Sequence, residues 1–205
     1  MKLKVCGMRD KENIKELLEL EPAYMGFIFW GASSRYVSET TDLLPKSIKK
    51  TGVFVDATTD YIQMTIKEQH LDAVQLHGNE SAAYCDLISE FGVEVIKAFS
   101  VNDLFDFSIL SAYESFCDYF LFDTKGELPG GNGIGFNWKV LGNYPSEKPF
   151  FLSGGIGPDD IEKIKQLIKT GLPLFAVDVN SKFELSPGEK NIEIVNAFKK
   201  QLDEL

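Results

Sequence analysis

The sequence predicts a single (β/α)8 barrel. Eight short apolar runs recur along the 205 residues, and each is followed by a turn and a stretch with helical spacing of apolar residues. The repeat is about 26 residues long, at the compact end for an eightfold parallel barrel. No linker rich in Pro or Ser divides the chain, so we expect residues 1–205 to form one domain.

An open doubly wound sheet is the alternative architecture. Such a sheet commonly carries a glycine-rich dinucleotide motif after its first strand, whereas this chain reads Cys6-Gly7-Met8-Arg9 at that place. The barrel is therefore the preferred interpretation.

The first four units each begin with a short apolar run, which is typical of a buried parallel strand. In the first helical stretch, Ile14, Leu17 and Leu18 follow helical spacing and Asp10 is suited to cap the N-terminus. We predict strands at 3–6, 25–30, 52–55 and 73–76, and helices near 10–20, 41–49, 60–68 and 80–91.

The last four units repeat this pattern. A Gly-rich loop separates the sixth strand from its helix, and Pro158 suits the first turn of the seventh helix. We predict strands at 93–98, 119–122, 150–152 and 174–177, and helices near 102–112, 137–142, 158–169 and 191–202.

Composition excludes several classes of partner. The chain has 21 Lys and Arg against 31 Asp and Glu, a net charge of −10, which argues against binding nucleic acid or an anionic membrane surface. The apolar runs are too short for a transmembrane helix, and the charged N-terminus does not resemble a signal peptide. Three cysteines form neither a disulfide framework nor a metal site, so we expect a cytoplasmic protein.

Polar residues follow several of the predicted strands, where catalytic groups of such barrels lie. They are far apart in the sequence, but a closed barrel would gather them around one mouth. These residues are Cys6, Arg35, Asp56, His77, Asp123, Ser153 and Asp178.

The loops after the seventh and eighth strands favour phosphate binding, a recurring feature of these barrels. In the first loop, Gly154, Gly155 and Gly157 allow backbone N–H groups to approach a ligand, next to a helix N-terminus that attracts anions. The second loop adds donors at Asn180 and Ser181. The alternative is an ordinary tight turn.

Two residues are candidates for proton transfer. Lys4 and Cys6 share one face of the first strand, and a neighbouring ammonium lowers the pKa of a thiol, which favours a nucleophile or a base; the alternative is an inert, buried Cys. Asp123 follows an aromatic strand, which favours its protonated form and a role as general acid. Its alternative is to cap the turn with Thr124.

The remaining candidates sit in loops. Segment 125–135 contains five glycines and suits a lid or a plain connector. Arg35 suits a carboxylate, although a surface role is the alternative. His77 is an acid–base or structural residue. Lys182 and Glu184 are expected to be solvated.

At these positions the sequence resembles the phosphoribosylanthranilate isomerases of tryptophan biosynthesis. The similar segments follow one another along essentially the whole chain, and the combined set is highly specific. They are Lys4-Val5-Cys6-Gly7, Ser34-Arg35-Tyr36-Val37, Gly52-Val53-Phe54-Val55, Val74-Gln75-Leu76-His77-Gly78, Phe122-Asp123-Thr124, Gly130-Gly131-Asn132-Gly133 with Phe136 and Trp138, Ser153-Gly154-Gly155, Val177-Asp178-Val179-Asn180-Ser181 and Pro187-Gly188-Glu189-Lys190.

The resemblance implies an Amadori rearrangement of N-(5-phosphoribosyl)anthranilate without a cofactor or a metal, with a small phosphorylated molecule as the ligand. It implies Cys6 as the base and Asp123 as the acid, and we expect a monomer. Substrate-binding roles are implied for Arg35, His77, Gly154, Gly155, Asp178, Asn180 and Ser181.

The chain departs from the common family pattern at Asn132, Asn180 and Lys182, all in binding loops. Two other functions stay open. One is another phosphosugar enzyme on the same barrel, although an indole-forming synthase would want a Lys–Glu pair in place of Cys6 and Asp123. The other is a non-catalytic barrel that binds a phosphorylated ligand.

Overall fold

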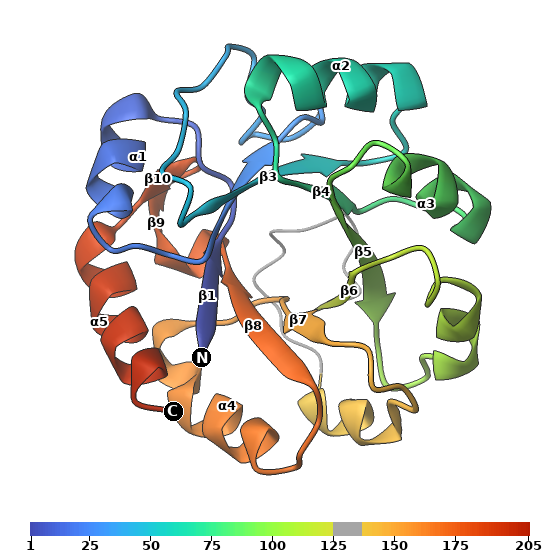
Figure 1. Ribbon diagram of the computed structural model, residues 1–205. Coiled ribbons are helices and arrows are strands. Elements are labelled where there is room, and N and C mark those ends of the chain that lie inside the picture. The colour runs from blue at the N-terminus through green and yellow to red at the C-terminus, as the bar shows by residue number, and fades with distance from the viewer. Residues whose placement is uncertain (125–136) are drawn as a thin grey trace.

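The chain folds into a closed barrel of parallel strands surrounded by helices (Figure 1). The computed structural model describes residues 1–124 and 137–205. Within them, eight strands pair in sequence order, and β8 closes the barrel against β1 through the register Lys4↔Asp178. The predicted (β/α)8 fold is confirmed. The predicted lid at 125–135 lies outside the described residues.

All eight predicted strands are present, several with longer bounds than the apolar runs. Many of the extra residues are polar positions at the strand ends, such as Lys49, Asp123 and Asp178, which hydrophobic runs do not mark; in the fifth and eighth strands the ladder also continues through Val101 and Val179. The strands are β1 (Lys2–Val5), β2 (Tyr24–Ile28), β3 (Lys49–Phe54), β4 (Ala73–Leu76), β5 (Glu94–Val101), β6 (Tyr119–Thr124), β7 (Phe150–Leu152) and β8 (Leu174–Val179).

Five α-helices cover the barrel in the described part of the chain, and four of them begin with a side-chain cap. The Asp10 side chain accepts the N–H of Asn13, as predicted, and Thr58, Ser81 and Asn191 cap the second, third and fifth helices in the same way. The helices are α1 (Lys11–Leu18), α2 (Thr59–Gln69), α3 (Ala82–Ser89), α4 (Ile161–Ile168) and α5 (Ile192–Asp203).

The predicted helix at 41–49 is wrong. Pro45 lacks an N–H and disfavours helix before it, and Lys49 already pairs with Tyr24 as the start of β3. The segment instead finds its polar partners in neighbouring elements: Gln69 accepts the N–H of Thr41 at 3.0 Å, and the buried Lys50 ammonium donates to the Thr41 carbonyl at 3.2 Å. The second unit therefore reaches β3 through a loop.

The predicted helices at 102–112 and 137–142 are short 3-10 helices, η1 (Phe107–Ala112) and η2 (Trp138–Asn143). Side chains that bond to their own local backbone explain the difference. Asn102 accepts the N–H of Leu104 at 3.0 Å, which forms a turn where the first helix was expected. A further 3-10 turn, η3 (Pro158–Asp160), leads into α4.

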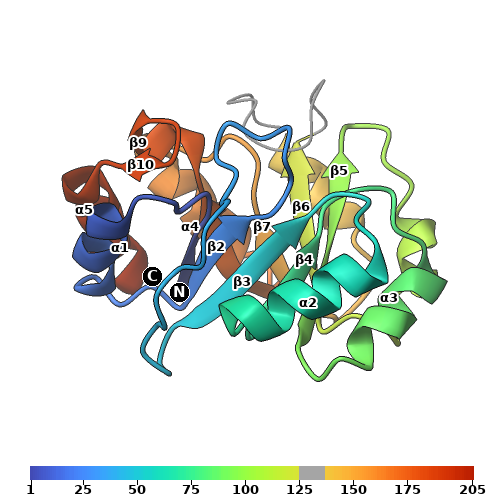
Figure 2. The same ribbon diagram turned by 90° about the horizontal axis from the view of Figure 1, so that it is seen from above.

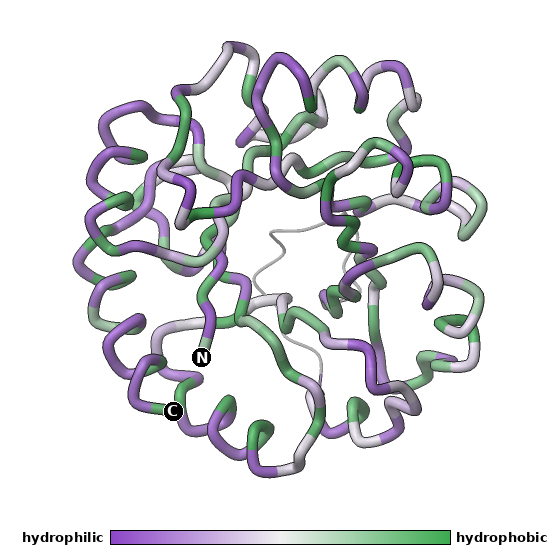
Figure 3. Tube along the Cα trace, viewed as in Figure 1, coloured by the Kyte–Doolittle hydropathy of each residue, from purple (hydrophilic) through white to green (hydrophobic). Residues whose placement is uncertain are grey.

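The core has two parts. The larger part lies between strands and helices, so the helices are hydrophobic toward the barrel and hydrophilic outside (Figure 3). The smaller part consists of side chains from six strands that touch one another, which is feasible only inside the barrel. It comprises Tyr24, Ala73, Ile96, Ala98, Leu121, Phe151 and Ala176.

Next to this smaller core, toward the carboxyl ends of the strands, the inward-pointing positions become polar. Lys4, Thr51 and Gln75 are all 1% exposed or less, and they continue the inward alternation toward the carboxyl ends. The apolar layer thus fills the barrel interior toward the amino ends of the strands, and polar side chains occupy the interior toward the carboxyl ends.

A small hairpin stands at the same end of the barrel. It follows β8 through a 3-10 turn, η4 (Ser181–Phe183), and consists of β9 (Glu184–Ser186) and β10 (Glu189–Lys190). Figure 2 shows the hairpin above α5 and α1. In the described ranges, 1–124 and 137–205, no helix has the length and apolar character needed to cross a membrane.

Candidate active site

The carboxyl ends of the strands enclose a cavity, and most of the polar residues predicted at the mouth line it. This gathering follows from barrel closure, since the contributing positions lie on different strands and loops. The predicted site residues in its lining are Cys6, Arg35, His77, Asp123, Ser153, Gly154, Gly155, Asp178, Asn180 and Ser181.

Asp56 does not line this cavity, contrary to its grouping with the other strand-end residues. Its Oδ1 accepts the N–H of Asn79 at 2.7 Å, and its own N–H donates to Glu80 at 3.0 Å. Asp56 therefore ties the turn after β3 to the turn after β4.

Cys6 lies directly after β1, at the wall of the cavity and 5% exposed. An added Cβ on Gly26 would lie 2.7 Å from the Cys6 sulfur, so the glycine on β2 makes room for the thiol. Sequence reasoning missed this role of Gly26, because an inward glycine on a strand carries no signal of what faces it.

The predicted lowering of the Cys6 pKa is wrong. Burial raises the pKa of the Cys6 thiol, and the opposing effect of Lys4 and Lys190 does not offset it. The Lys4 ammonium donates to Asp178 Oδ2 at 2.9 Å, so its charge is already partnered. Burial opposes the charge of Lys4, but Asp178 keeps the Lys4 pKa above its usual value.

Asp123 projects into the cavity from β6 and is 5% exposed. Its Oδ1 accepts the N–H of Thr124 at 2.8 Å, the capping contact weighed as its alternative role. Its Oδ2 lies 3.1 Å from Nε2 of His77, whose Nδ1 is 2.9 Å from the Gln75 amide nitrogen. The carboxyl group is thus both a local cap and part of a polar chain that reaches β4.

The glycine loop after β7 approaches Asp123 closely. Gly154 has φ +90°, and an added Cβ would lie 2.3 Å from the Thr124 hydroxyl and 2.8 Å from Asp123 Oδ1. Within the described residues, the N–H groups of Gly154 and Gly155 have no hydrogen-bond acceptor. Both glycines line the same cavity as Asn180 and Ser181, an arrangement suited to an anion.

Two buried oxygens on the cavity lining have no hydrogen-bond partner within residues 1–124 and 137–205: Oδ1 of Asp178 and Oε1 of Gln75. Buried polar atoms are normally hydrogen-bonded, so unpaired acceptors at a cavity suit donors on a ligand. Both side chains occupy inward-pointing positions of their strands, β8 and β4.

Arg35 lines the cavity from the loop after β2, and a carboxylate of the protein already holds it. Glu184 accepts from Nε of Arg35 at 2.9 Å and from Nη2 at 2.7 Å, and these bonds raise the pKa of Arg35. The prediction that Glu184 is solvated is wrong, because its side chain is 5% exposed. Lys182 is exposed, as predicted.

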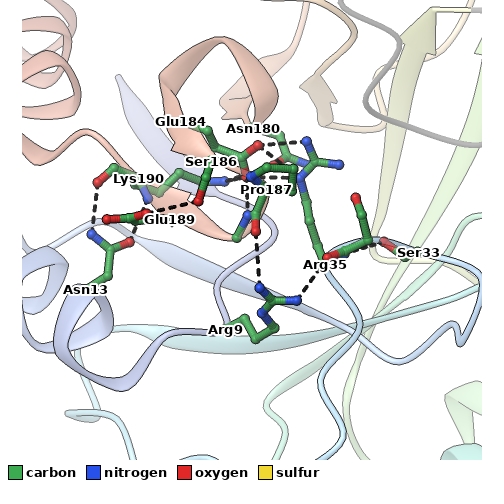
Figure 4. A network of polar contacts seen from close by, with 12 residues as sticks. Arg9, Asn13, Ser33, Arg35, Asn180, Glu184, Ser186, Pro187, Glu189 and Lys190 are labelled. Atoms are coloured by element: carbon green, nitrogen blue, oxygen red, sulfur yellow. Dashed lines mark hydrogen bonds and ion pairs between the residues drawn. The ribbon is translucent and has the colours of Figure 1, made fainter.

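The polar network around Arg35 and the hairpin is drawn in Figure 4. Lys190 is buried and donates to Glu184 and to Asn180 Oδ1, the latter at 2.9 Å. The sequence did not predict Glu184 and Lys190 as site residues, although Lys190 belongs to one of the segments that carry the family resemblance. Charged residues in a terminal loop are usually solvated, and only the folded hairpin shows that these two are enclosed.

Comparison with known proteins gives a consistent family. Residues 3–201 match the family model described as N-(5′-phosphoribosyl)anthranilate (PRA) isomerase. A protein of that name from Parabacteroides distasonis is 42% identical over 209 residues, which cover 98% of this chain and 93% of that protein.

Solved structures agree with the fold. The phosphoribosyl anthranilate isomerase of Thermus thermophilus has a TM-score of 0.88 at 24% identity and covers 100% of this chain and 99% of its own. A phosphoribosyl anthranilate isomerase in complex with reduced 1-(o-carboxyphenylamino)-1-deoxyribulose 5-phosphate has a TM-score of 0.83 at 29% identity, with 100% of both chains covered.

Proposed function

Because the chain belongs to the N-(5′-phosphoribosyl)anthranilate isomerase family, an isomerase family of tryptophan biosynthesis, we propose that Cys6 and Asp123 carry out an Amadori rearrangement of N-(5′-phosphoribosyl)anthranilate. The product is 1-(2-carboxyphenylamino)-1-deoxyribulose 5-phosphate. The observation that carries this proposal is one cavity lined by a thiol, a carboxyl group, a guanidinium and a glycine-rich anion loop.

The reaction begins with proton delivery by Asp123 to the ribose ring oxygen. The C1–O bond breaks toward that oxygen, and the nitrogen lone pair forms a protonated Schiff base at C1. A positioned acid fits this step because the ring oxygen is a poor leaving group without a proton. Asp123 is buried at the cavity wall, where its carboxyl group can transfer a proton directly to a ligand in the cavity.

The second step is proton removal at C2 by Cys6. The Schiff base cation acidifies the C2 proton, and the electron pair left on C2 forms an enolamine, which tautomerises to the ketone. The raised pKa of Cys6 means that the free enzyme holds mainly the thiol. We expect the cation formed in the first step to lie beside Cys6 and to favour the thiolate. The thiol proton then passes to solvent, and the resulting thiolate removes the C2 proton.

The two ends of the substrate have separate binding groups. Gly154, Gly155, Asn180 and Ser181 offer donors for the phosphate, and Arg35 offers a guanidinium for the carboxylate. Holding both ends fixes the reacting carbons between acid and base, which converts binding energy into orientation. His77 and Asp178 also line the cavity and suit the ribose hydroxyl groups.

The function is tested by adding the protein to freshly made phosphoribosylanthranilate and following the anthranilate fluorescence. Enzyme-dependent decay, with the predicted ketone identified by mass spectrometry, is the expected result. Absence of turnover with tight binding of the reduced product would instead favour a non-catalytic barrel. The monomeric state is a separate prediction, checked by analytical ultracentrifugation.

Arg35→Lys should weaken substrate binding, because lysine lacks the planar fork that pairs with a carboxylate. We expect KM for phosphoribosylanthranilate to rise about tenfold with kcat little changed. The comparison substrate is phosphoribosylaniline, which lacks the carboxylate and should be much less sensitive. Equal losses on both substrates would show that Arg35 does not bind the carboxylate.

The pH dependence of Cys6 follows from the direction of its pKa. Because the thiolate is the reactive form, alkylation of the ligand-free enzyme by iodoacetamide should be slow at neutral pH and rise about tenfold per pH unit, still rising above pH 9. Peptide mass spectrometry separates Cys6 from Cys85 and Cys117. A rate at Cys6 that levels off below pH 8 would contradict a raised pKa.

A further inference from the structure

Arg35 is held by its neighbours before any ligand binds. Glu184 occupies the edge of the guanidinium formed by Nε and Nη2, at 2.9 and 2.7 Å. The remaining nitrogen, Nη1, has no hydrogen-bond partner in the described part of the chain, and Figure 4 shows it pointing away from Glu184. One edge of the fork is therefore committed and another is left for a ligand.

Glu184 is itself fixed rather than free to follow Arg35. Its side chain is 5% exposed, and Oε1 accepts the N–H of Gly188 at 3.1 Å as well as the Lys190 ammonium. Burial opposes its charge, but Arg35 and Lys190 keep the pKa of Glu184 below its usual value. Glu184 is thus an ionised, anchored acceptor.

The hairpin that carries Glu184 is tied to the barrel at two further places. Asn13 on α1 pairs with the backbone of Lys190 in both directions, at 2.8 and 2.7 Å. Arg9 donates to the carbonyl of Ser34 at 3.0 Å and to that of Pro187 at 3.3 Å, which links the loop before Arg35 to the hairpin. Both ends of the Arg35–Glu184 contact therefore rest on fixed backbone.

The charges in this cluster favour one more anion. Burial lowers the pKa of Lys190, although Glu184 favours its charged form. With Lys190 charged, Arg35 and Lys190 are positive and Glu184 is negative, so the three side chains together carry one net positive charge. A ligand carboxylate on the open edge of Arg35 would make the cluster neutral, which suits a buried site better than an uncompensated cation. The cluster therefore suits one ligand carboxylate.

We infer that Glu184 is a positioning residue that orients the Arg35 guanidinium for the carboxylate of the substrate's aromatic ring. This inference rests on the proposed function. Glu184 acts through Arg35 and does not itself touch the substrate. Its effect should be confined to ligands that carry the carboxylate, whereas a purely structural residue would affect every ligand of the cavity.

The test measures binding of two ligands to Glu184→Gln. One is reduced 1-(o-carboxyphenylamino)-1-deoxyribulose 5-phosphate, and the other is the same molecule without the carboxyl group. Glutamine retains the shape but only one acceptor oxygen and no charge, so the first ligand should bind about tenfold more weakly, and the second within twofold of wild type. Equal weakening of both ligands, or of neither, would overturn the inference.

A double-mutant cycle separates positioning from general stability. In an Arg35→Ala background, Glu184→Gln should cause no further loss of affinity for the carboxylated ligand, because the group that it orients is gone. A further tenfold loss would assign Glu184 a role independent of Arg35. Glu189→Gln is the matched control, since this exposed residue of the same hairpin bonds to Ser186 and should leave both affinities unchanged.

Glu184→Asp covers the case in which the glutamine variant does not fold. Aspartate keeps the charge but is one methylene shorter. The ratio of the affinity for the carboxylated ligand to that for the ligand without the carboxyl group should therefore lie between the ratios of wild type and Glu184→Gln. A ratio equal to that of wild type would contradict the inference. Turnover by the wild type separates the two proposals. If the wild type does not isomerise phosphoribosylanthranilate, the proposed function is wrong. If it does, but the Glu184 variants have the same ratio of affinities for the two ligands as wild type, only the role of Glu184 is wrong.

Discussion

Replacing Cys6 with serine should lower kcat for phosphoribosylanthranilate by about 10²–10⁴-fold, the usual contribution of a positioned general base. A serine hydroxyl stays protonated across the working pH range, whereas the thiol loses its proton once the Schiff base cation lies beside it. The substitution is small and the cavity otherwise unchanged, so binding of the reduced product analogue should stay within about threefold of wild type, or about 0.65 kcal/mol. Steady-state fluorescence and equilibrium binding measure the two quantities.

Cys85→Ala is the control for this experiment, because Cys85 is a buried thiol on α3 that does not line the cavity. Its kcat should be near that of wild type at a temperature where the protein stays folded. Near-normal turnover by Cys6→Ser would exclude Cys6 as the base. Loss of ligand binding together with turnover would instead point to a disturbed cavity.

Asp123→Asn should lower turnover of the closed-ring substrate by about 10²–10⁴-fold, because an amide cannot deliver a proton to the ring oxygen. Its oxygen can still accept the N–H of Thr124, the contact that Asp123 makes at 2.8 Å. The variant should therefore fold normally and stop before ring opening. A substrate analogue that is already open-chain should bypass the block, since the remaining step requires only Cys6.

The decisive comparison is turnover of both substrate forms by the asparagine variant. An equal loss on the two would show that Asp123 is not the ring-opening acid and would direct attention to His77 or Asp178. Asp56→Asn is the matched control: Asp56 follows β3, lies outside the cavity lining and needs only an acceptor for the N–H of Asn79. Its rate should be unchanged.

Local patterns were sufficient to predict the order of the strands and most of the helices. Apolar runs mark each strand because both faces of a barrel strand are covered, and Asp10 caps α1 by a contact that spans three residues. The prediction was wrong at 41–49, where the spacing of apolar residues resembles that of a helix but contacts with residues outside the segment determine its conformation. Gln69 and Lys50 satisfy the backbone of this segment, and no local pattern indicates their positions.

The candidate site was predictable to the extent that barrel closure determines it. Once the strands are placed, residues at their carboxyl ends must meet, so the sequence alone predicts that Cys6 and Asp123 share one cavity. The state of those residues was not predictable. The pKa of Cys6 depends on the balance between burial and the nearby lysines, and the ammonium expected to lower it is paired with Asp178, 174 residues away in sequence.

The sequence by itself determined the fold class, the order of the strands and most of the residues that face the mouth of the barrel, since these follow from periodicity and strand ends. Only the tertiary structure decided that Glu184 and Lys190 are enclosed and that Arg35 meets a carboxylate of its own chain. The physical reason is that an ion pair depends on which charges the closed barrel brings within about 3 Å, and Arg35 and Glu184 are 149 residues apart. Sequence periodicity contains no information about such a contact.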